Sequence, residues 1–160
     1  MEVIEKITSY NIFTNLLPGA VFVYAADRYY GTGFISDDLL VNVFVFYFFG
    51  LLIGRVGSLL VEPPLKYMQL IRKNSYGQYI DAERSDAKIG VLLEARNVYR
   101  SFVALCLLLL ILSVYRYAEL QFPMISEWRG LIATLFLGIL FLISFIKQDK
   151  YIVERVKNGS

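Results

Sequence analysis

Histidine is absent from the 160 residues of this chain, and there is a single cysteine, Cys106. Histidine is the usual proton shuttle and the commonest metal ligand, so its absence excludes most metal centres and most acid–base mechanisms. A single cysteine can form neither an intrachain disulfide nor a thiolate metal site. The sequence also contains no glycine-rich phosphate loop and no nucleophile elbow. We therefore expect a protein that is not an enzyme and holds no metal or cofactor.

Charge of either sign is scarce. The chain has 16 basic and 14 acidic residues, for a net charge of +2, and the basic residues are spread along it. Nucleic-acid-binding proteins instead concentrate positive charge in one patch or stripe. We therefore expect no direct binding to nucleic acid.

Uncharged, apolar sequence is abundant, and 57% of the residues are hydrophobic. Runs of 15 to 20 residues without a charge cover 7–26, 39–54, 101–115 and 130–146. A helix needs roughly 17–25 residues to cross the hydrocarbon of a bilayer. We therefore predict an all-α polytopic membrane protein with one domain over 1–157. Its four transmembrane helices are expected at about 8–26, 39–61, 100–118 and 129–147.

The basic residues outside these spans predict the orientation of the chain. Leaving out Arg55, three of them lie in the two short connections after the first and third spans, and twelve lie on the other side. Basic residues are enriched on the cytoplasmic side of a membrane. We therefore predict a multi-pass protein of the cell inner membrane, with both termini and a charged arm, 62–99, in the cytoplasm.

Within the arm 62–99, a turn is expected at 74–77 and a charged helix over about 78–100, because no proline interrupts 78–100 and apolar residues recur there near helical spacing. Gly90 is expected to weaken this helix. The helix can continue into the third span. Pro63 and Pro64 are expected to end the second helix, since proline lacks a backbone donor. A short helix over 65–73 would then lie on the membrane surface.

Pro18 and Gly19 lie inside the first apolar run. Proline removes one backbone hydrogen bond and clashes with the preceding turn, so a kink is expected near Leu16. The kink is either a functional hinge or a structural bend, and the sequence leaves both alternatives open.

Small residues recur at helical spacing in two of the spans. Gly50 and Gly54 are one turn apart in the second span. A similar stripe in the fourth span consists of Gly130, Thr134 and Gly138. Small side chains let the backbones of two membrane helices approach closely. Each stripe is therefore expected to pack either on another helix of the chain or on a second subunit.

One polar constellation lies toward the end of the second span and consists of Arg55, Ser58 and Glu62. At 100° per residue, Arg55 and Glu62 lie within about 20° of each other, two turns apart, with Ser58 alongside. Ionisable groups within a membrane commonly mark functional sites, so these residues are candidates for a polar cytoplasmic mouth. Alternatively, Arg55 extends its side chain to the membrane surface and has no other role.

The partners of these two charges are expected near the start of the third span. Glu94 is the expected partner of Arg55. Either Arg96 or Arg100 is expected to pair with Glu62, because the start of the third helix must lie near the end of the second. We therefore include Glu94, Arg96 and Arg100 in the same candidate mouth.

Three segments carry a resemblance to a known group of proteins: 15–19 (NLLPG), 54–63 (GRVGSLLVEP) and 94–102 (EARNVYRSF). Together with the four-span layout, they resemble small inner-membrane proteins of bacterial anti-phage defence loci, of the CRISPR-accessory or Kiwa type. The resemblance implies an oligomeric membrane component that works with a cytosolic nucleic-acid-sensing or nuclease partner. An arginine–histidine nuclease motif of one such group is impossible here, because the chain has no histidine.

These features favour a non-enzymatic, homo-oligomeric membrane component that docks a cytosolic protein through 62–100. A second hypothesis is a channel or pore formed by several copies, with Arg55 or Glu62 near its cytoplasmic mouth. A third is a lipid-modifying membrane enzyme that uses the helix face bearing these two charges. Conductance measured on purified protein in planar bilayers would separate the first two.

Overall fold

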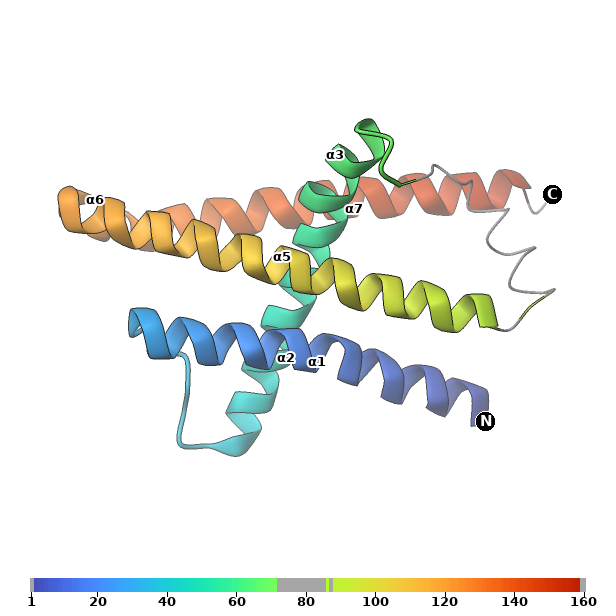
Figure 1. Ribbon diagram of the computed structural model, residues 1–160, viewed down its shortest axis with the longest axis horizontal. Coiled ribbons are helices and arrows are strands. Elements are labelled where there is room, and N and C mark those ends of the chain that lie inside the picture. Colours follow the sequence, from blue (N-terminus) through green and yellow to red (C-terminus); the bar gives the residue numbers. More distant parts are fainter. Residues whose placement is uncertain (1, 72–85, 87, 159–160) are drawn as a thin grey trace.

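The structure, a computed structural model, describes residues 2–71, 86 and 88–158, and every regular element among them is a helix. The elements are α1 (Glu2–Tyr30), α2 (Leu39–Val56), the π-helical turn η1 (Gly57–Val61), α3 (Glu62–Tyr67), α5 (Lys88–Gln121), α6 (Met124–Glu127) and α7 (Arg129–Asn158) (Figure 1). The predicted all-α class is thereby confirmed for this part of the chain. Residues 72–85 and 87 of the predicted arm lie outside the described residues.

Among the described residues, three helical segments are long and apolar enough to span a membrane: Leu39–Tyr67, Lys88–Gln121 and Arg129–Val153. They contain the second, third and fourth predicted spans. The first predicted span lies within α1, which is not among these three, so that span stays a prediction. The length and composition of these helices indicate a membrane protein, with three candidate spans in the described part of the chain.

α5 is longer than a bilayer requires. Its 34 residues extend about 51 Å, against roughly 30 Å of hydrocarbon. The helix begins at Lys88 and runs past Gly90 into the predicted third span without a break. The expected helical continuity is therefore confirmed from Lys88 onward.

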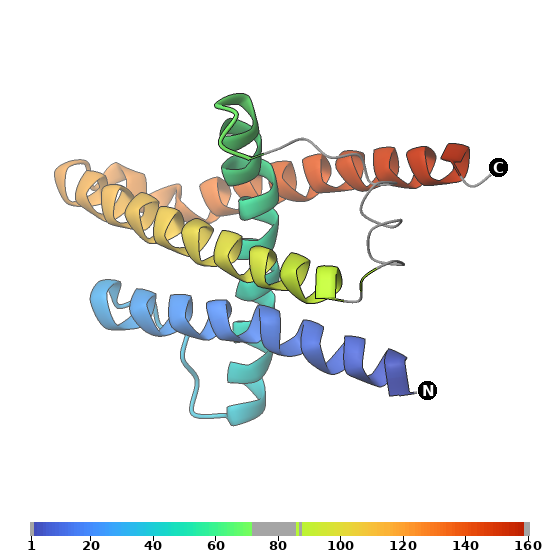
Figure 2. The same ribbon diagram turned by 45° about the vertical axis from the view of Figure 1, so that its right-hand side comes forward.

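Three long helices lie roughly along one direction, and the remaining helical segment crosses them. α1, α5 and α7 run alongside one another, whereas α2–η1–α3 crosses them steeply in both views (Figures 1 and 2). α5 and α7 run in opposite directions, because α6 and its flanking turns reverse the chain between them.

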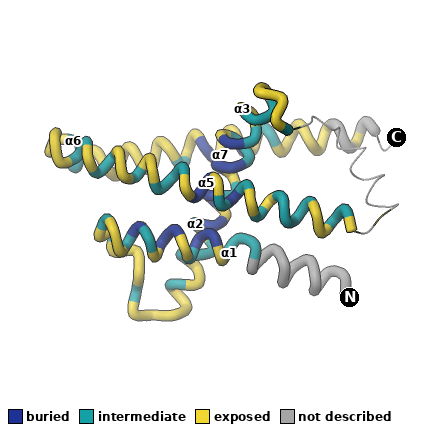
Figure 3. The backbone as a smooth tube through the Cα atoms, in the orientation of Figure 1, coloured by how far each residue is buried: buried dark blue, intermediate teal, exposed yellow. Residues whose placement is uncertain are grey.

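The buried core lies where these helices cross. Its residues are Phe22, Val23, Ala26, Leu52, Ile53, Val56, Val61, Ala104, Leu105 and Leu140. Figure 3 shows buried residues near the crossings and exposed residues along much of the helices. Large apolar side chains such as Phe44, Leu110 and Phe145 are at least 65% exposed. Extensive apolar surface is unfavourable in water and is accommodated by lipid, which supports a bilayer environment.

α1 and α2 cross with their backbones in contact, and two glycines make this possible. A Cβ atom on Gly50 would overlap the main-chain carbonyl of Asn15, and one on Gly19 would overlap that of Phe46. Gly19 therefore serves close packing. α1 is one helix that continues through the buried Pro18, and a functional hinge at this pair of residues stays a prediction.

The second helix does not end at Pro63 and Pro64, contrary to the prediction from the sequence. The preceding turn is a π-helix, in which the N–H of Glu62 donates to the carbonyl of Gly57, five residues back. This places both prolines in the first turn of α3, where the fixed φ of proline is compatible with a helix. The carbonyl of Ser58, to which Pro63 cannot donate, accepts from a side chain instead. The segment therefore stays helical to Tyr67.

The predicted surface helix over 65–73 is shorter than expected. α3 ends at Tyr67, and Gln69 adopts a left-handed conformation with φ of 60°. The N–H of Leu70 then bonds to the carbonyl of Leu65 at 3.0 Å, which closes the end of the helix. The last two residues of the predicted range lie outside the described part of the chain.

Candidate functional site

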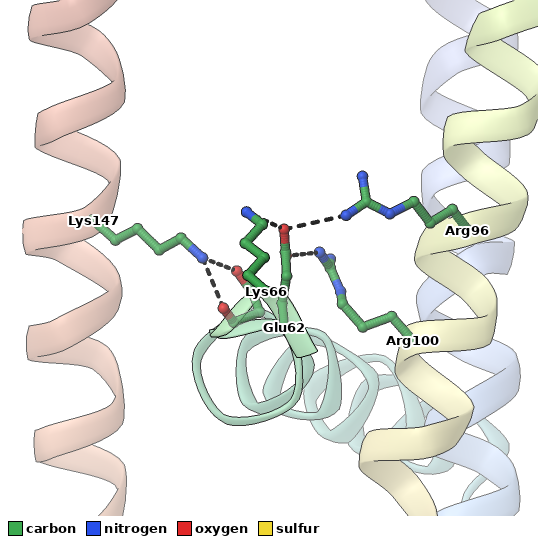
Figure 4. A network of polar contacts seen from close by, with 6 residues as sticks. Glu62, Lys66, Arg96, Arg100 and Lys147 are labelled. Carbon is green, nitrogen blue, oxygen red and sulfur yellow. Dashed lines mark hydrogen bonds and ion pairs between the residues drawn. The ribbon is translucent and has the colours of Figure 1, made fainter. Parts of the chain in front are cut away.

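Glu62 forms the centre of a polar cluster at the end of α2–η1–α3. Its Oε1 lies 2.7 Å from Lys66 Nζ and 3.3 Å from Arg96 Nη2, and its Oε2 lies 2.7 Å from Arg100 Nη1 (Figure 4). The Glu62 side chain is only 12% exposed, so these cations surround a largely covered carboxylate. The pairing that the sequence predicts between Glu62 and Arg96 or Arg100 is formed, and both arginines take part.

Helix geometry explains why these side chains meet. Lys66 is four residues after Glu62 in the same helix, so the two side chains lie on one face. Arg96 and Arg100 are also one turn apart, on α5, which packs against η1. Gly57 permits that close packing, because a Cβ atom there would lie 3.1 Å from Arg100 Cγ. Both guanidinium groups therefore reach the carboxylate from the same helix.

Lys147, on α7, joins the cluster from the opposite side (Figure 4). Its Nζ donates to the main-chain carbonyl of Ser58 at 2.7 Å and to Ser58 Oγ at 2.6 Å. It also lies 5.9 Å from the centre of the Tyr151 ring, within the range of a cation–π contact. These partners are uncharged, so they do not neutralise the ammonium group.

The availability of the Ser58 carbonyl follows from the π-helical turn. In a π-helix this oxygen would accept from the residue five positions later, which is Pro63, and proline has no N–H. The residue four positions later, Glu62, already donates to Gly57. Lys147 therefore supplies the hydrogen bond that the main chain cannot supply, and the polar carbonyl is satisfied.

Arg55 and Glu94 are not part of this network. Arg55 is exposed on α2, and no ion pair joins it to Glu94 or to another described residue. The predicted pairing between these two residues is therefore not formed. The exposed position of Arg55 agrees with the alternative, in which a long side chain extends along the helix to the membrane surface.

The two stripes of small residues differ in what they contact. Gly50 packs on α1 within the chain, and a Cβ atom on Gly54 would meet α1 at an ordinary van der Waals distance. Cβ atoms on Gly130 and Gly138 would meet nothing within 4 Å in the described chain. Thr134 is also exposed, and its hydroxyl bonds to the main chain of its own helix. The stripe on α7 is therefore open.

Sequence reasoning did not include Lys66 or Lys147 in this site. Lys66 has a clear signal, because it follows Glu62 by four residues on a helix. Lys147 has a weaker signal. It is the first charge after one apolar run, and Arg100 is the last charge before another, so antiparallel helices bring the two to a similar level.

The cluster contains four cations and one carboxylate, and three of the cations contact that carboxylate. Guanidinium groups stay protonated in proteins, and a carboxylate held by three cations is a poor base. These side chains come from α3, α5 and α7, with Ser58 contributed by η1. The arrangement therefore favours helix alignment and anion binding over proton transfer.

No protein-family model matches this chain, and no curated protein or solved structure is significantly similar to it. The resemblance to membrane proteins of defence loci therefore rests on three sequence segments and the span layout alone. Function has to be inferred from the cluster and the exposed surfaces of the chain itself.

Proposed function

We propose that this chain is a non-enzymatic, homo-oligomeric component of the bacterial inner membrane, which serves in anti-phage defence and docks a cytosolic protein through 62–100. The Glu62 cluster is the observation that carries the proposal. Its contacts tie α3 to α5 and η1 to α7, and its carboxylate is occupied by three cations. Such a cluster supports the fixed alignment of helices that a membrane scaffold needs.

The proposed topology has four spans and cytoplasmic termini. It requires α2–η1–α3, which crosses the other long helices steeply, to tilt toward their direction in the bilayer (Figure 1). The first span lies inside α1, whose 29 residues extend about 44 Å. The N-terminal end of α1, the start of α5 and the C-terminal end of α7 lie toward one side of the molecule (Figure 1). The excess of basic residues near these ends favours the cytoplasm for that side.

α7 is the proposed contact between copies. Its stripe of Gly130, Thr134 and Gly138 is exposed, and small residues one turn apart are typical of helix contacts in membranes. At 100° per residue, Lys147 lies about 180° from Gly138 around the helix. The side chain that ties α7 to η1 therefore leaves the opposite face to a second copy.

The arm 62–100 is the proposed docking segment because it is the longest charged stretch between two spans. Its described ends are joined by the ion pairs of Glu62 with Arg96 and Arg100. A partner bound to the arm would therefore be linked directly to α2 and α5. This linkage would let a cytosolic event change the arrangement of the membrane helices.

Cysteine cross-linking in membranes tests the oligomer. In a Cys106→Ser background, Thr134→Cys is expected to form disulfide-linked dimers on mild oxidation. Phe136→Cys is the matched control, because this exposed position lies about 200° further round the same helix. It is expected to stay monomeric. Equal cross-linking at both positions, or none at Thr134→Cys, would count against the α7 contact.

Phage challenge tests the defence role and the docking arm. Cells that express the chain with its neighbouring genes are expected to lose protection when 72–87 is replaced by a glycine–serine linker of equal length. The same replacement of 31–35, in a short connection on the other side, is the control and should keep protection. Protection that survives the first replacement, at an equal amount of chain in the membrane, would rule out docking through the arm.

A second candidate function, a pore formed by several copies, is favoured by the exposure of Arg55. Glu62 is paired within the chain, so Arg55 is the charge available to line such a pore. A ring of arginines favours anions. On this hypothesis, purified protein in planar bilayers gives an anion-selective conductance that Arg55→Gln weakens, whereas the scaffold gives no conductance.

A further inference from the structure

We propose that the Glu62 cluster binds the phosphate of an anionic phospholipid in the cytoplasmic leaflet. The binding groups are the cationic side chains of Lys66 on α3, Arg96 and Arg100 on α5, and Lys147 on α7 (Figure 4). The proposal depends on insertion into a membrane. It does not depend on oligomerisation or on a cytosolic partner. The lipid site and the proposed scaffold function can therefore be refuted separately.

The cluster has an excess of positive charge. Even without Arg96, the three cations Lys66, Arg100 and Lys147 outnumber the single carboxylate of Glu62. Both carboxylate oxygens are occupied, while ammonium and guanidinium groups carry more N–H donors than two oxygens can accept. Arg100 Nε is buried and has no hydrogen-bond acceptor among the described residues. An additional anion on the exposed side of the cluster would offset this charge; it would not reach the buried Arg100 Nε.

The cations are more accessible than the carboxylate. The side chains of Lys66 and Arg96 are 30% and 38% exposed, against 12% for Glu62. An approaching phosphate would therefore meet positive charge first. The guanidinium group also offers a planar set of donors that fits two phosphate oxygens at once.

The position of the cluster along the helices matches the headgroup region of a bilayer. Arg100 directly precedes the uncharged run 101–115 of α5, and Lys147 directly follows the run 130–146 of α7. Because α5 and α7 run in opposite directions, both residues mark the same end of the apolar layer (Figure 1). Phospholipid headgroups lie at this boundary. The cluster is therefore at the right depth for a lipid phosphate.

An anionic lipid fits this charge better than a zwitterionic lipid, whose headgroup amine offsets the phosphate. Four or more basic side chains beside a membrane helix, and basic pockets between membrane helices, are typical of anionic-lipid recognition. Tyr67 and Met68, at the end of α3, are 88% and 64% exposed. They provide apolar surface near the cluster along which acyl chains can pack.

Native mass spectrometry of the full chain in detergent tests the proposal. At equal collision energy, the wild type is expected to retain bound phosphatidylglycerol and to lose phosphatidylcholine with the same acyl chains. Lys66→Gln/Arg96→Gln should retain phosphatidylglycerol about tenfold more weakly, because each basic residue near a membrane surface contributes a factor of several. Lys88→Gln/Lys150→Gln is the matched control. It removes the same charge from exposed positions outside the cluster and should behave like the wild type.

Glu62→Gln gives an expectation of opposite sign. It removes the anion that competes with the lipid phosphate, so phosphatidylglycerol should bind a few-fold more tightly than to the wild type. A cluster that only holds helices together would instead lose its organisation in this variant and bind no lipid better. Helical content and elution volume in detergent identify a variant that fails to fold. The comparison of the two lipids on the wild type still tests the proposal in that case, because it needs no variant.

Inorganic phosphate separates a lipid site from a site for a soluble anion. Millimolar phosphate is expected to leave bound phosphatidylglycerol in place, because the acyl chains contribute to binding. Displacement of the lipid by phosphate alone would overturn the lipid assignment. Equal retention of the two lipids by the wild type, or equal losses in the two double variants, would overturn it as well.

Discussion

Two crossings join α2–η1–α3 to the rest of the molecule, and they are built in opposite ways. At Gly50, α1 comes so close that the two backbones touch, and a single added methyl group would overlap α1. At Glu62 and Ser58, α5 and α7 are held through long charged side chains that bridge the space between helices. The glycine crossing depends on the absence of atoms, and the polar crossing depends on the presence of particular atoms.

This difference reflects what can hold helices together in lipid. Apolar side chains gain little from leaving a lipid phase, so one solution is close backbone packing through small residues. The other is a polar network, which is favourable in an apolar surrounding only if its members are paired. The glycine crossing should therefore fail when volume is added. The polar crossing should fail when charge or a hydrogen bond is removed.

The largest effect is expected from added volume at the glycine crossing. Gly50→Ala should lower the free energy of unfolding by about 3 kcal/mol or more, because α1 must move away from the new methyl group. Unfolding of purified protein in detergent measures this loss. Gly138→Ala adds the same methyl group to the open face of α7 and should change stability by no more than about 1 kcal/mol. Equal losses in the two variants would refute the close crossing.

The next effect is expected from loss of the central carboxylate. Glu62→Gln should cost about 1–3 kcal/mol of unfolding free energy in neutral detergent, because three cations lose their counter-charge. Salt should reduce the loss by screening the remaining cations from one another. Glu119→Gln, which removes the partner of Arg116 within α5, should cost less than about 1 kcal/mol. An equally large loss of unfolding free energy in Glu119→Gln and Glu62→Gln would show that the cluster stabilises the fold no more than an ordinary ion pair within one helix does.

A smaller effect is expected at the contact between α7 and η1. Lys147→Met should cost about 1–2 kcal/mol, since two hydrogen bonds to Ser58 are lost. Ser58→Ala should cost less, because the main-chain carbonyl still binds the ammonium group. The double variant should cost less than the sum of the two. Strict additivity in a double-mutant cycle would contradict the direct contact.

The role of Lys147 as a substitute donor can be tested by returning a backbone N–H. Pro63→Ala restores a donor five residues after Ser58, in the position that the π-helical turn requires. Combined with Lys147→Met, it should recover part of the lost stability, on the order of 1 kcal/mol. Without Lys147→Met the same substitution should have little benefit. An equal effect of Pro63→Ala in both backgrounds would exclude this explanation.

The smallest effect is expected at Arg55, which lies between the two crossings and belongs to neither. Arg55→Leu should change the free energy of unfolding by less than about 0.5 kcal/mol, because the side chain is exposed and makes no described ion pair. Assembly should also be unchanged if the side chain only extends to the membrane surface. A loss of assembly or of conductance in this variant would favour the pore hypothesis.

Much of the fold follows from features that are local in the sequence. Uncharged runs of sufficient length predicted the helices that contain the three candidate spans. In lipid, a segment outside a closed β-barrel can form all its backbone hydrogen bonds only as a helix. The pairing of Glu62 with Arg96 or Arg100 followed from the expectation that the third span begins close to the point where the second span ends. The stripe at Gly50 indicated a close helix contact, although the sequence left its partner open.

The remaining features depend on which helices meet, and periodicity within one helix does not contain that information. Gly19 was read with Pro18 as part of a kink, because its partner at Phe46 lies on another helix. Pro63 was read as the end of a helix, since a missing donor usually ends one. Here the freed carbonyl of Ser58 is satisfied by Lys147, which is 89 residues away in sequence.

η1 has a consequence for how the helix can change over evolution. A π-helical turn accommodates one residue inserted into an α-helix, while the flanking turns keep their direction. Loss of one codon in 57–61 would therefore return this turn to an ordinary α-helix and leave Glu62 directed at α5. Loss of one codon in 51–56 would instead turn Glu62 by about 100° relative to Gly50, so η1 is where this helix can shorten without uncoupling its charged end from its glycine contact.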